Sequence, residues 1–375
     1  MRIVLVGGGT AGHINPALAV GTYIKRKEPN AEILYIGAKG GMEEKLVPAA
    51  GFDFKGINIS GFSRKISLKS LKHNIKTIKN IFTSASESRK ILDEFKPDIC
   101  FGTGGYVCGP FLWEAGKRGI PYLIHDSNAF PGVTTKLLAK NARKILLVSD
   151  SAKKYFNSDL DTVVVGNPVR HELAEQTQTE AKSALNFDDK PVILSFGGSL
   201  GARAINEAVA ELITHSVKNN FYNHIHGFGK SGHWFKNLLE NQNIETENNS
   251  RLCIKEYINN MPICMAAADL IICRAGAMTI SELQNTGKPA ILIPSPNVAE
   301  NHQYHNAMTL VNARAASIIE EKDLTGETLI KEVAGLLDNK EILDTYSKNL
   351  KKTAIIDADK RIYDIIKEIL NGKDR

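Results

Sequence analysis

The residues best suited to chemistry lie in the stretch Gly7–Pro16, which reads GGGTAGHINP. The apolar run Ile3–Val6 precedes it, and a second apolar run starts at Ala17. A strand, a glycine turn and a helix start in this order place backbone N–H groups at the positive end of a helix dipole, where an anion can bind. His13 adds a side chain that titrates near neutral pH. The stretch therefore predicts an anion cradle with a candidate base beside it.

The elements that must position this stretch alternate between strands and helices. Such alternation predicts a parallel sheet with helices on both faces. Two further loops follow predicted strands in the first half of the chain, GTGGYVCGP at Gly102–Pro110 and HDSN at His125–Asn128. Ligands of such sheets bind beyond the carboxyl ends of the strands. We therefore expect these two loops to share one rim with Gly7–Pro16.

The pattern restarts in the second half of the chain. A polar stretch covers 171–190, then the strand Val192–Phe196 leads into GGSLGAR at Gly197–Arg203, which resembles the first glycine loop. The repeat predicts two Rossmann-like α/β domains that face each other across a cleft. The predicted domains are 1–168 and 169–344, and a terminal helix at about 345–375 is expected to pack back on the first.

Composition places the chain among ordinary globular proteins, with 375 residues, 43% hydrophobic residues and a net charge of +6. Five cysteines without a CxxC motif predict buried thiols, with neither disulfides nor a zinc site. The sequence enters a strand almost at its first residue, so no signal peptide is expected. No apolar run reaches the ~18–20 residues that a transmembrane helix needs. We expect a cytoplasmic protein whose membrane contact, if any, is peripheral.

A basic segment in the first half has two interpretations. Residues 54–86 contain no Asp or Glu, and an apolar stripe at helical spacing runs beside a stripe of lysines. Such a helix suits an anionic membrane surface. The same pattern also fits an amphipathic helix that packs on its own sheet. The membrane interpretation rests on Lys65, Lys69, Lys72, Leu68, Leu71, Ile75 and Phe82.

The second half offers a candidate nucleotide site. The strand Asp269–Cys273 runs into RAGAMTISEL, in which Glu282 lies one turn into a helix, where its carboxylate could accept two ribose hydroxyls. The alternative is that Glu282 only compensates the helix dipole. A nicotinamide site is disfavoured, because no acidic residue ends the second strand, near Ile36. His302 and His305 lack the partners of a metal site.

Seven blocks, taken in order, resemble one family. They are GGGTAGHINPALA, GTGGYVCGP, HDSN, GNPVR, GGSLGAR, CRAGAMTISE and NHQYHNA. The set spans nearly the whole chain and is similar to the MurG family of bacterial GlcNAc transferases. The resemblance implies the GT-B fold and an inverting transfer of GlcNAc from UDP-GlcNAc to the C4 hydroxyl of MurNAc in lipid I. The products would be UDP and lipid II, the precursor of peptidoglycan.

The resemblance also implies a peripheral protein on the cytoplasmic face of the bacterial inner membrane. No cofactor and no nucleic-acid partner are expected, and the lack of a DxD-type carboxylate pair in a loop predicts that the diphosphate needs no metal. The resemblance raises the weight of the membrane interpretation of the basic helix, because the acceptor lipid I is anchored in that membrane.

Residue roles carry over from the same resemblance. His13 is the candidate base and Asp126 the second choice; the alternative is that His13 only binds substrate or orients its turn. Tyr106 would lie on the acceptor side. The residues expected to contact UDP-GlcNAc are Thr10, Ala11, Gly12, Asn128, Arg170, Ser199, Ile258, Ala277, Met278, Thr279, Ile280, Ser281, Glu282 and Gln303.

The chain departs from the family pattern in a few places. Asp126 and Ser127 stand where the family usually has Glu and Gln, and the shorter carboxylate has less reach. Leu200 stands where Gln is common, so one polar contact to the donor would be missing. Three rival functions remain: a transferase for another lipid such as diacylglycerol, a UDP-sugar epimerase, and a binding module without catalysis.

Overall fold

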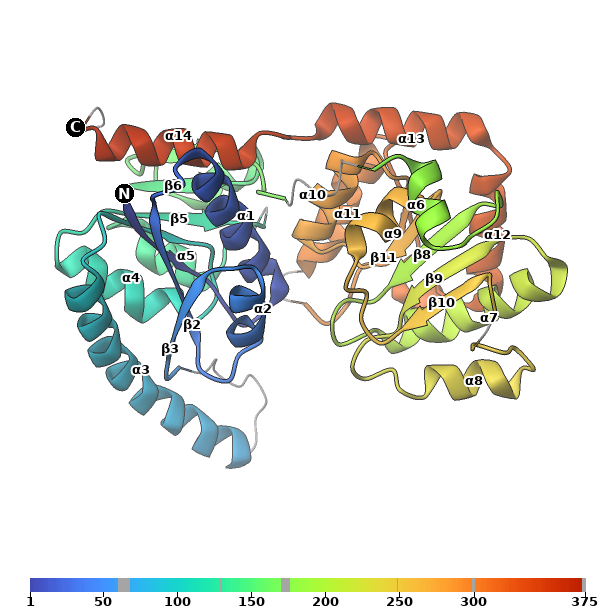
Figure 1. The fold of residues 1–375 in the computed structure, drawn as a ribbon, viewed down its shortest axis with the longest axis horizontal. Coiled ribbons are helices and arrows are strands. Elements are labelled where there is room, and N and C mark those ends of the chain that lie inside the picture. The colour runs from blue at the N-terminus through green and yellow to red at the C-terminus, as the bar shows by residue number, and fades with distance from the viewer. Residues whose placement is uncertain (60–67, 129, 170–175, 248, 299–300, 373–375) are drawn as a thin grey trace. The chain divides into compact units, whose positions relative to one another are not determined.

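The computed structural model describes residues 1–59, 68–128, 130–169, 176–247, 249–298 and 301–372. The sequence predictions at Lys65 and Arg170 lie outside these residues. The chain divides into two compact units, Met1–Val169 with Ile355–Arg375 and Arg170–Ala354. Each unit is an α/β sandwich built on one parallel sheet (Figure 1).

The sheet of the first unit has the strand order β3-β2-β1-β4-β5-β6-β7 in the described residues, and every neighbouring pair is parallel. Apart from Arg2 at the start of β1, its central strands β1 and β4 are apolar and buried, as expected for strands covered by helices on both faces. The order reverses between β1 and β4, which creates a switch point where ligands bind in such sheets. The strands are β1 Arg2–Val6, β2 Glu32–Ala38, β3 Asp53–Ile57, β4 Ile99–Gly102, β5 Tyr122–Asp126, β6 Lys144–Leu147 and β7 Thr162–Val164.

Helices cover both faces of this sheet. One buried cluster joins the sheet to α3 and α4 through Leu92 and Phe111, and a second joins it to α1 and α14 through Ile14 and Ile366. In Figure 1, α14 lies beside α1 although the two helices come from opposite ends of the chain. The helices are α1 Ala11–Lys27, α2 Glu43–Ala49, α3 Leu68–Phe95, α4 Cys108–Lys117, α5 Val133–Ala139 and α14 Ala358–Leu370, with a 3₁₀ turn at Asp150–Tyr155.

The second unit repeats the design with the parallel order β10-β9-β8-β11-β12-β13. Its core joins β8 and β11 to α7 and α12. The strands are β8 Val192–Phe196, β9 Asn223–Gly227, β10 Leu252–Lys255, β11 Leu270–Cys273, β12 Ala290–Leu292 and β13 Ser317–Ile318. The helices are α6 Gln178–Ala184, α7 Arg203–Asn219, α8 Phe235–Asn241, α9 Met261–Ala267, α10 Ala277–Thr286, α11 His302–Asn312, α12 Gly326–Leu337 and α13 Lys340–Thr353.

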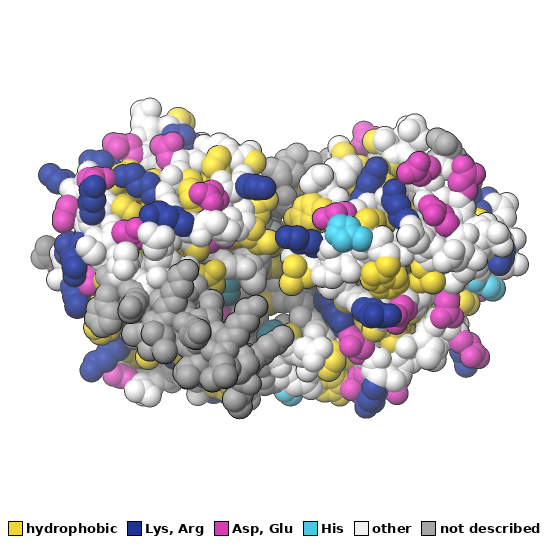
Figure 2. All heavy atoms as spheres, turned by 90° about the horizontal axis from the view of Figure 1, so that it is seen from below, with side chains coloured by type: hydrophobic (Ala, Val, Ile, Leu, Met, Phe, Trp, Pro, Cys, Tyr) yellow, Lys and Arg dark blue, Asp and Glu magenta, His cyan; other side chains and the backbone are white. Residues whose placement is uncertain are grey.

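Charge is spread over the surface of each unit. On the face shown in Figure 2, Lys and Arg side chains lie interspersed with Asp and Glu on both units. In the part of the chain that the structure describes, no helix is both long enough and apolar enough to cross a membrane. The described cysteines carry free thiols.

Candidate active site

His13 lies at the switch point of the first sheet, in the first turn of α1. Its Nδ1 is 2.9 Å from the carbonyl oxygen of Thr103, at the end of β4. A carbonyl oxygen can only accept, so Nδ1 donates its hydrogen there. In the neutral ring, Nε2 then keeps its lone pair and can accept a proton. The backbone thus fixes the tautomer that a general base requires.

The loop after β4 holds His13 in place. Thr103 Oγ1 donates to the His13 carbonyl oxygen at 2.5 Å, so Thr103 holds the residue at both its ring and its backbone. Gly104 has φ of +100°, and a Cβ there would lie 2.8 Å from His13 Nδ1. Only glycine fits under the ring in this conformation. The glycine loop after β4 therefore packs against the His13 ring and fixes its orientation.

Burial sets the charge state of His13. Desolvation lowers the pKa of the imidazole from its ordinary 6.5, and this effect exceeds the upward pull of the Asp126 carboxylate and of the Thr103 hydrogen bond. The ring is therefore neutral at neutral pH, which is the form that a base needs.

Asp126 has a different environment from the one expected for a base. Its Oδ2 accepts from the Gly132 N–H at 2.8 Å and from the Thr135 hydroxyl at 2.6 Å. Its Oδ1 accepts from the Asn128 N–H at 3.0 Å. The carboxylate thus holds the loop between β5 and α5 and supports the start of α5. This arrangement favours His13 over Asp126 as the base.

The remaining first-unit residues line the same rim. Thr10 is the exposed N-cap of α1, followed by Ala11 and Gly12 in its first turn. The Tyr106 ring covers Gly9, where a Cβ would meet Tyr106 Cε1 at 2.9 Å. Asn128 is held against Asp126. The structure brings all of these residues to the carboxyl ends of β1, β4 and β5.

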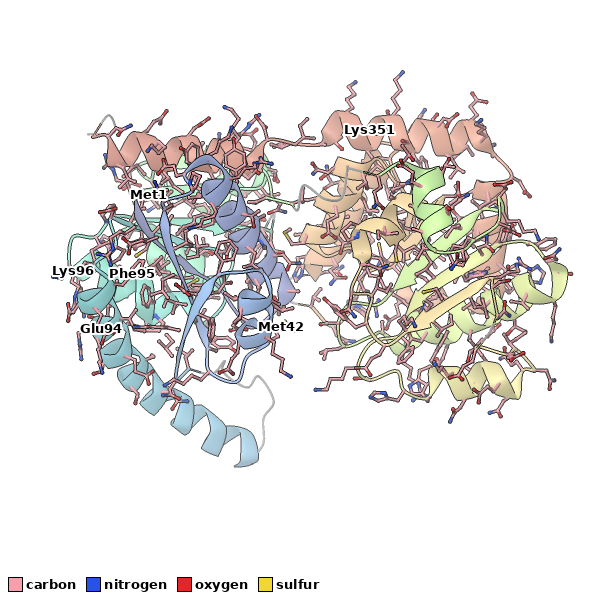
Figure 3. All side chains as sticks on the ribbon, viewed as in Figure 1. Met1, Met42, Glu94, Phe95, Lys96 and Lys351 are labelled. Carbon is pink, nitrogen blue, oxygen red and sulfur yellow. The ribbon has the colours of Figure 1, made fainter. Side chains whose placement is uncertain are left out.

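Glu43 is a residue of this rim that the motif patterns missed. It is fully buried at the start of α2, directly after Met42, which Figure 3 labels. Its carboxylate lies under the first glycine loop, since a Cβ on Gly8 would meet Glu43 Oε1 at 2.2 Å. A carboxylate at this position disfavours an anion on the same loop, so the first loop is a poorer phosphate cradle than its glycines predict.

The second unit carries its own rim of predicted residues. Ser199 lies in the turn between β8 and α7, where its carbonyl oxygen accepts from the Lys230 N–H at 3.1 Å. Ile258 follows β10 and is buried against Gly227. Because the Ile258 side chain is apolar, only its backbone groups can hydrogen-bond a ligand.

The start of α10 follows β11 directly. Ala277, Met278 and Thr279 form its first turn after the N-cap Gly276, so their N–H groups lie at the positive end of the helix. Ile280 and Ser281 turn their side chains into the unit, and the Ser281 hydroxyl donates to the Ala277 carbonyl oxygen at 3.1 Å. Glu282 lies one turn in and is partly exposed.

Gln303, at the start of α11, already uses one of its polar atoms. Its Oε1 accepts from the Ser295 N–H at 2.9 Å and so fixes the loop after β12. Arg274, whose role was not predicted, supports the same loop by donating to the carbonyl oxygens of Ile293 and Pro294 at 3.2 and 3.1 Å. Gln303 therefore has its amide nitrogen to offer a ligand.

In the described residues, no group of three or more His, Cys, Asp and Glu side chains is arranged to hold a metal ion. Among the predicted basic-helix residues, the backbone of α3 is described, but the side chains of Leu68, Lys69, Leu71, Lys72, Ile75 and Phe82 lie outside the described residues, as does the whole of Lys65.

Two Rossmann-like units, each built on one parallel sheet, form the GT-B fold. The profile of the glycosyltransferase family 28 N-terminal domain matches residues 3–147, and that of the C-terminal domain matches residues 192–368. The chain belongs to glycosyltransferase family 28.

Within this family, the chain is similar to transferases of one kind. The chain is 43% identical over 374 residues to the UDP-N-acetylglucosamine--N-acetylmuramyl-(pentapeptide) pyrophosphoryl-undecaprenol N-acetylglucosamine transferase of Acetivibrio thermocellus, covering 100% of this chain and 99% of the relative. It is 26% identical to a crystal structure of MurG from Acinetobacter baumannii, with a TM-score of 0.71, covering 98% of this chain and 99% of the other.

An enzyme of one rival class, the UDP-sugar epimerases, has a similar fold. A UDP-GlcNAc 2-epimerase from Neisseria meningitidis, bound to UDP-GlcNAc, matches with a TM-score of 0.66, covering 98% of this chain and 100% of the other. At 14% identity, this likeness concerns the fold alone.

Proposed function

We propose that this protein transfers GlcNAc from UDP-GlcNAc to the C4 hydroxyl of MurNAc in lipid I, with inversion at the anomeric carbon, and releases UDP and lipid II. The observation that carries the proposal is the 43% identity, over the full length, to the transferase of Acetivibrio thermocellus. The orientation of the His13 ring also supports the proposal, because an inverting transfer needs a base for the acceptor proton and the bond from Nδ1 to Thr103 leaves Nε2 as that acceptor.

In the proposed reaction, the first unit supplies the base and the second unit binds most of the donor. His13 Nε2 takes the proton of the C4 hydroxyl while the oxygen attacks the anomeric carbon. The bond from that carbon to the diphosphate oxygen breaks, and UDP leaves with an added negative charge. The N–H groups of Ala277–Thr279 at the start of α10, together with Arg170, stabilise that charge.

The other contacts are assigned by position on each rim. On the second unit, Ser199 contacts the diphosphate, Ile258 the uracil and Glu282 the ribose. Gln303 donates its amide hydrogens to GlcNAc hydroxyls. The first unit supplies further contacts around His13 through Thr10, Ala11, Gly12, Asn128 and Tyr106. Ile280 and Ser281 contribute backbone atoms to the binding of UDP-GlcNAc.

We also propose a peripheral site on an anionic membrane, at the cytoplasmic face of the inner membrane. The predicted basic helix α3 packs against α4, and α4 packs against α5. On these two neighbours, large apolar side chains are exposed: Trp113 at 47%, Val133 at 74% and Leu137 at 71%. Lys117 lies 5.6 Å from the Trp113 ring. Apolar side chains beside lysines suit an anionic lipid surface.

A donor and acceptor screen that follows UDP release tests the function. We expect UDP from UDP-GlcNAc only when a lipid I analogue is present, and a disaccharide product. UDP release with diacylglycerol as acceptor would identify the rival transferase. Conversion of UDP-GlcNAc without any acceptor would identify an epimerase, and no turnover at all would leave a binding module.

Sedimentation with vesicles tests the membrane proposal. Vesicles with anionic phospholipid should bind the protein, and about 1 M salt should release much of it, because salt screens charge. Equal binding to purely zwitterionic vesicles would contradict a site built on lysines.

A further inference from the structure

Glu43 is a buried carboxylate whose side chain occupies a space that three glycines leave open. Its side chain is fully buried. Three glycines border it: a Cβ on Gly8 would lie 2.2 Å from Oε1, one on Gly37 2.3 Å from Cγ, and one on Gly41 2.6 Å from Cδ. These three positions belong to the first glycine loop, to β2 and to the turn before α2. Any side chain larger than glycine's at these positions would displace the carboxylate.

The two oxygens of Glu43 join two elements. Oε1 accepts from the Ala38 N–H at 2.8 Å, at the end of β2. Oε2 lies 3.5 Å from the Gly9 nitrogen, in the loop that leads to α1. A carboxylate can accept at both oxygens, whereas an amide of the same shape offers one acceptor and one donor. The two N–H groups therefore match a carboxylate and not its amide analogue.

The opposite side of the loop is closed as well. The Tyr106 ring lies against Gly9, and a Cβ on Gly105 would meet the Gly8 carbonyl oxygen at 2.2 Å. Gly8 and Gly9 are thus held between the Glu43 carboxylate and the segment Gly105–Tyr106. His13 follows Gly9 by four residues, and Thr103 bonds both its ring and its backbone. The loop and the imidazole are consequently fixed from both ends.

A purely structural role is the alternative, because an acidic residue in the first turn of a helix compensates the helix dipole. Glu44 also lies in that turn, is exposed, and bonds the Gly40 N–H at 2.9 Å. Dipole compensation does not require a fully buried residue, nor glycines from three separate segments. The burial and the contact with the loop of His13 point to a positioning role.

We infer that Glu43 is a positioning residue of the transfer reaction. Its carboxylate fixes the position of the Gly7–Gly9 loop and thereby the position of His13 relative to the acceptor hydroxyl. The inference rests on the proposed function, and it deepens that function by adding a residue that does not touch substrate. Because most contacts to the donor are assigned to the second unit, we expect a change at Glu43 to lower turnover more than donor binding.

The test compares Glu43→Gln with Glu114→Gln. Glu114 is a matched control, since it is a buried carboxylate of the same unit, on α4, paired with Arg118 at 3.2 Å. We expect Glu43→Gln to lower kcat by about 10-fold, as the loss of one acceptor for a buried N–H implies. The KM for UDP-GlcNAc should stay within about 2-fold. Glu114→Gln should keep kcat, although it lowers the melting temperature of the unit.

A second measurement separates this inference from the proposed function. Amide hydrogen exchange over Val6–Ile14 should speed up in Glu43→Gln and stay unchanged in Glu114→Gln, whether or not the protein turns over lipid I. An unchanged kcat in a folded Glu43→Gln protein, or unchanged exchange in that segment, would overturn the positioning role. Failure of the wild-type protein to release UDP would instead overturn the proposed function and leave the exchange result standing.

Discussion

At the scale of single residues, His13 is defined by what its two nitrogens can do. Nδ1 donates to the Thr103 carbonyl oxygen, so only Nε2 of the neutral ring can accept a proton. The GGGTAGH motif was enough to predict the residue and its helix. The tautomer could not be predicted, because it depends on a carbonyl oxygen 90 residues away in the sequence.

His13→Ala tests the base directly. We expect kcat to fall by at least about 10²-fold, because no other group would take the acceptor proton. Donor affinity, measured by titration with UDP-GlcNAc, should be nearly unchanged. In the wild type, kcat should be constant at neutral pH and fall as the pH drops through the His13 pKa, below 6.5, since protonation removes the base. Near-normal turnover of His13→Ala would contradict the assignment; His215→Ala on α7 is the control.

Asp126→Asn separates the two candidate bases. The carboxylate raises the pKa of His13, so its removal should shift the acidic limb of kcat to lower pH. The pH profile of kcat checks this shift, and Asp161→Asn, on the loop before β7, serves as the control. If the acidic limb disappeared together with activity, Asp126 itself would be the base.

At the scale of elements, the sequence patterns found the central strands more readily than the edges. The run Ile3–Val6 is apolar and buried on both faces, so its pattern alone indicates a strand of a covered parallel sheet. Strand β3 reads DFKGI, in which three of the five residues, Asp, Lys and Gly, are depleted in strands. Its place is set by pairing with β2, from Leu34–Asp53 to Ala38–Ile57, which no local pattern shows.

The same limit applies to the site. The motif loops were predicted because the residues that mark each of them are adjacent in the sequence. Glu43 was missed because the glycines that accommodate it lie on separate segments, among them Gly8 and Gly37. Only the folded sheet brings these positions together.

Strand β9 carries two buried histidines whose protonation should destabilise the second unit. His224 has no hydrogen-bond partner at either nitrogen in the described structure and lies near Arg251. His226 bonds Ser195 through Nδ1 at 2.8 Å, and its ring contacts the Phe235 ring in a tilted arrangement. Burial is the main cause that lowers the pKa of each to about 3.

The consequence is a pH-dependent free energy of unfolding. The unfolded chain binds protons on these side chains below about pH 6.5, whereas the folded unit does not, so stability is complete above pH 6.5 and is lost as the pH falls toward 3. At pH 5 the loss is on the order of 2 kcal/mol per histidine.

His224→Leu should reduce the loss of stability between pH 7.5 and pH 5 by about 2 kcal/mol, because it removes one of the two groups. Urea unfolding at the two pH values, followed by fluorescence, provides the measurement. The exposed His233, replaced by Gln, should leave the pH dependence unchanged. An identical pH dependence in His224→Leu would show that acid acts elsewhere.

At the scale of the whole molecule, the first unit is discontinuous in sequence. A single terminal helix at about 345–375 was expected, but the structure has two, α13 in the second unit and α14 in the first. The chain between them is extended at Ala354, and Ile355 packs against Gly166. The apolar spacing of α14 predicted a packed helix; the break before it depends on a glycine from another part of the chain.

Ile366→Ala tests how much the first unit depends on α14. Ile366 is fully buried in the cluster that includes Ile14 of α1, so we expect a loss of about 2–5 kcal/mol in the stability of the first unit. Calorimetry should show a lower melting temperature for one transition, with the second unit unaffected. Lys367→Ala, which breaks only the partly exposed ion pair with Glu28, should cost less than about 1 kcal/mol. Equal effects of the two variants would contradict the packing role.

The discontinuity of the first unit also has a consequence for biosynthesis. The ribosome delivers Met1–Val169 first, yet the helix that covers the apolar face of α1 is translated only after the whole second unit. The second unit is contiguous and can fold as soon as it leaves the exit tunnel. The first unit can therefore be completed only after the second unit has been synthesised, and we expect the apolar residues of α1 that pack with Ile366 to stay partly uncovered until translation reaches α14.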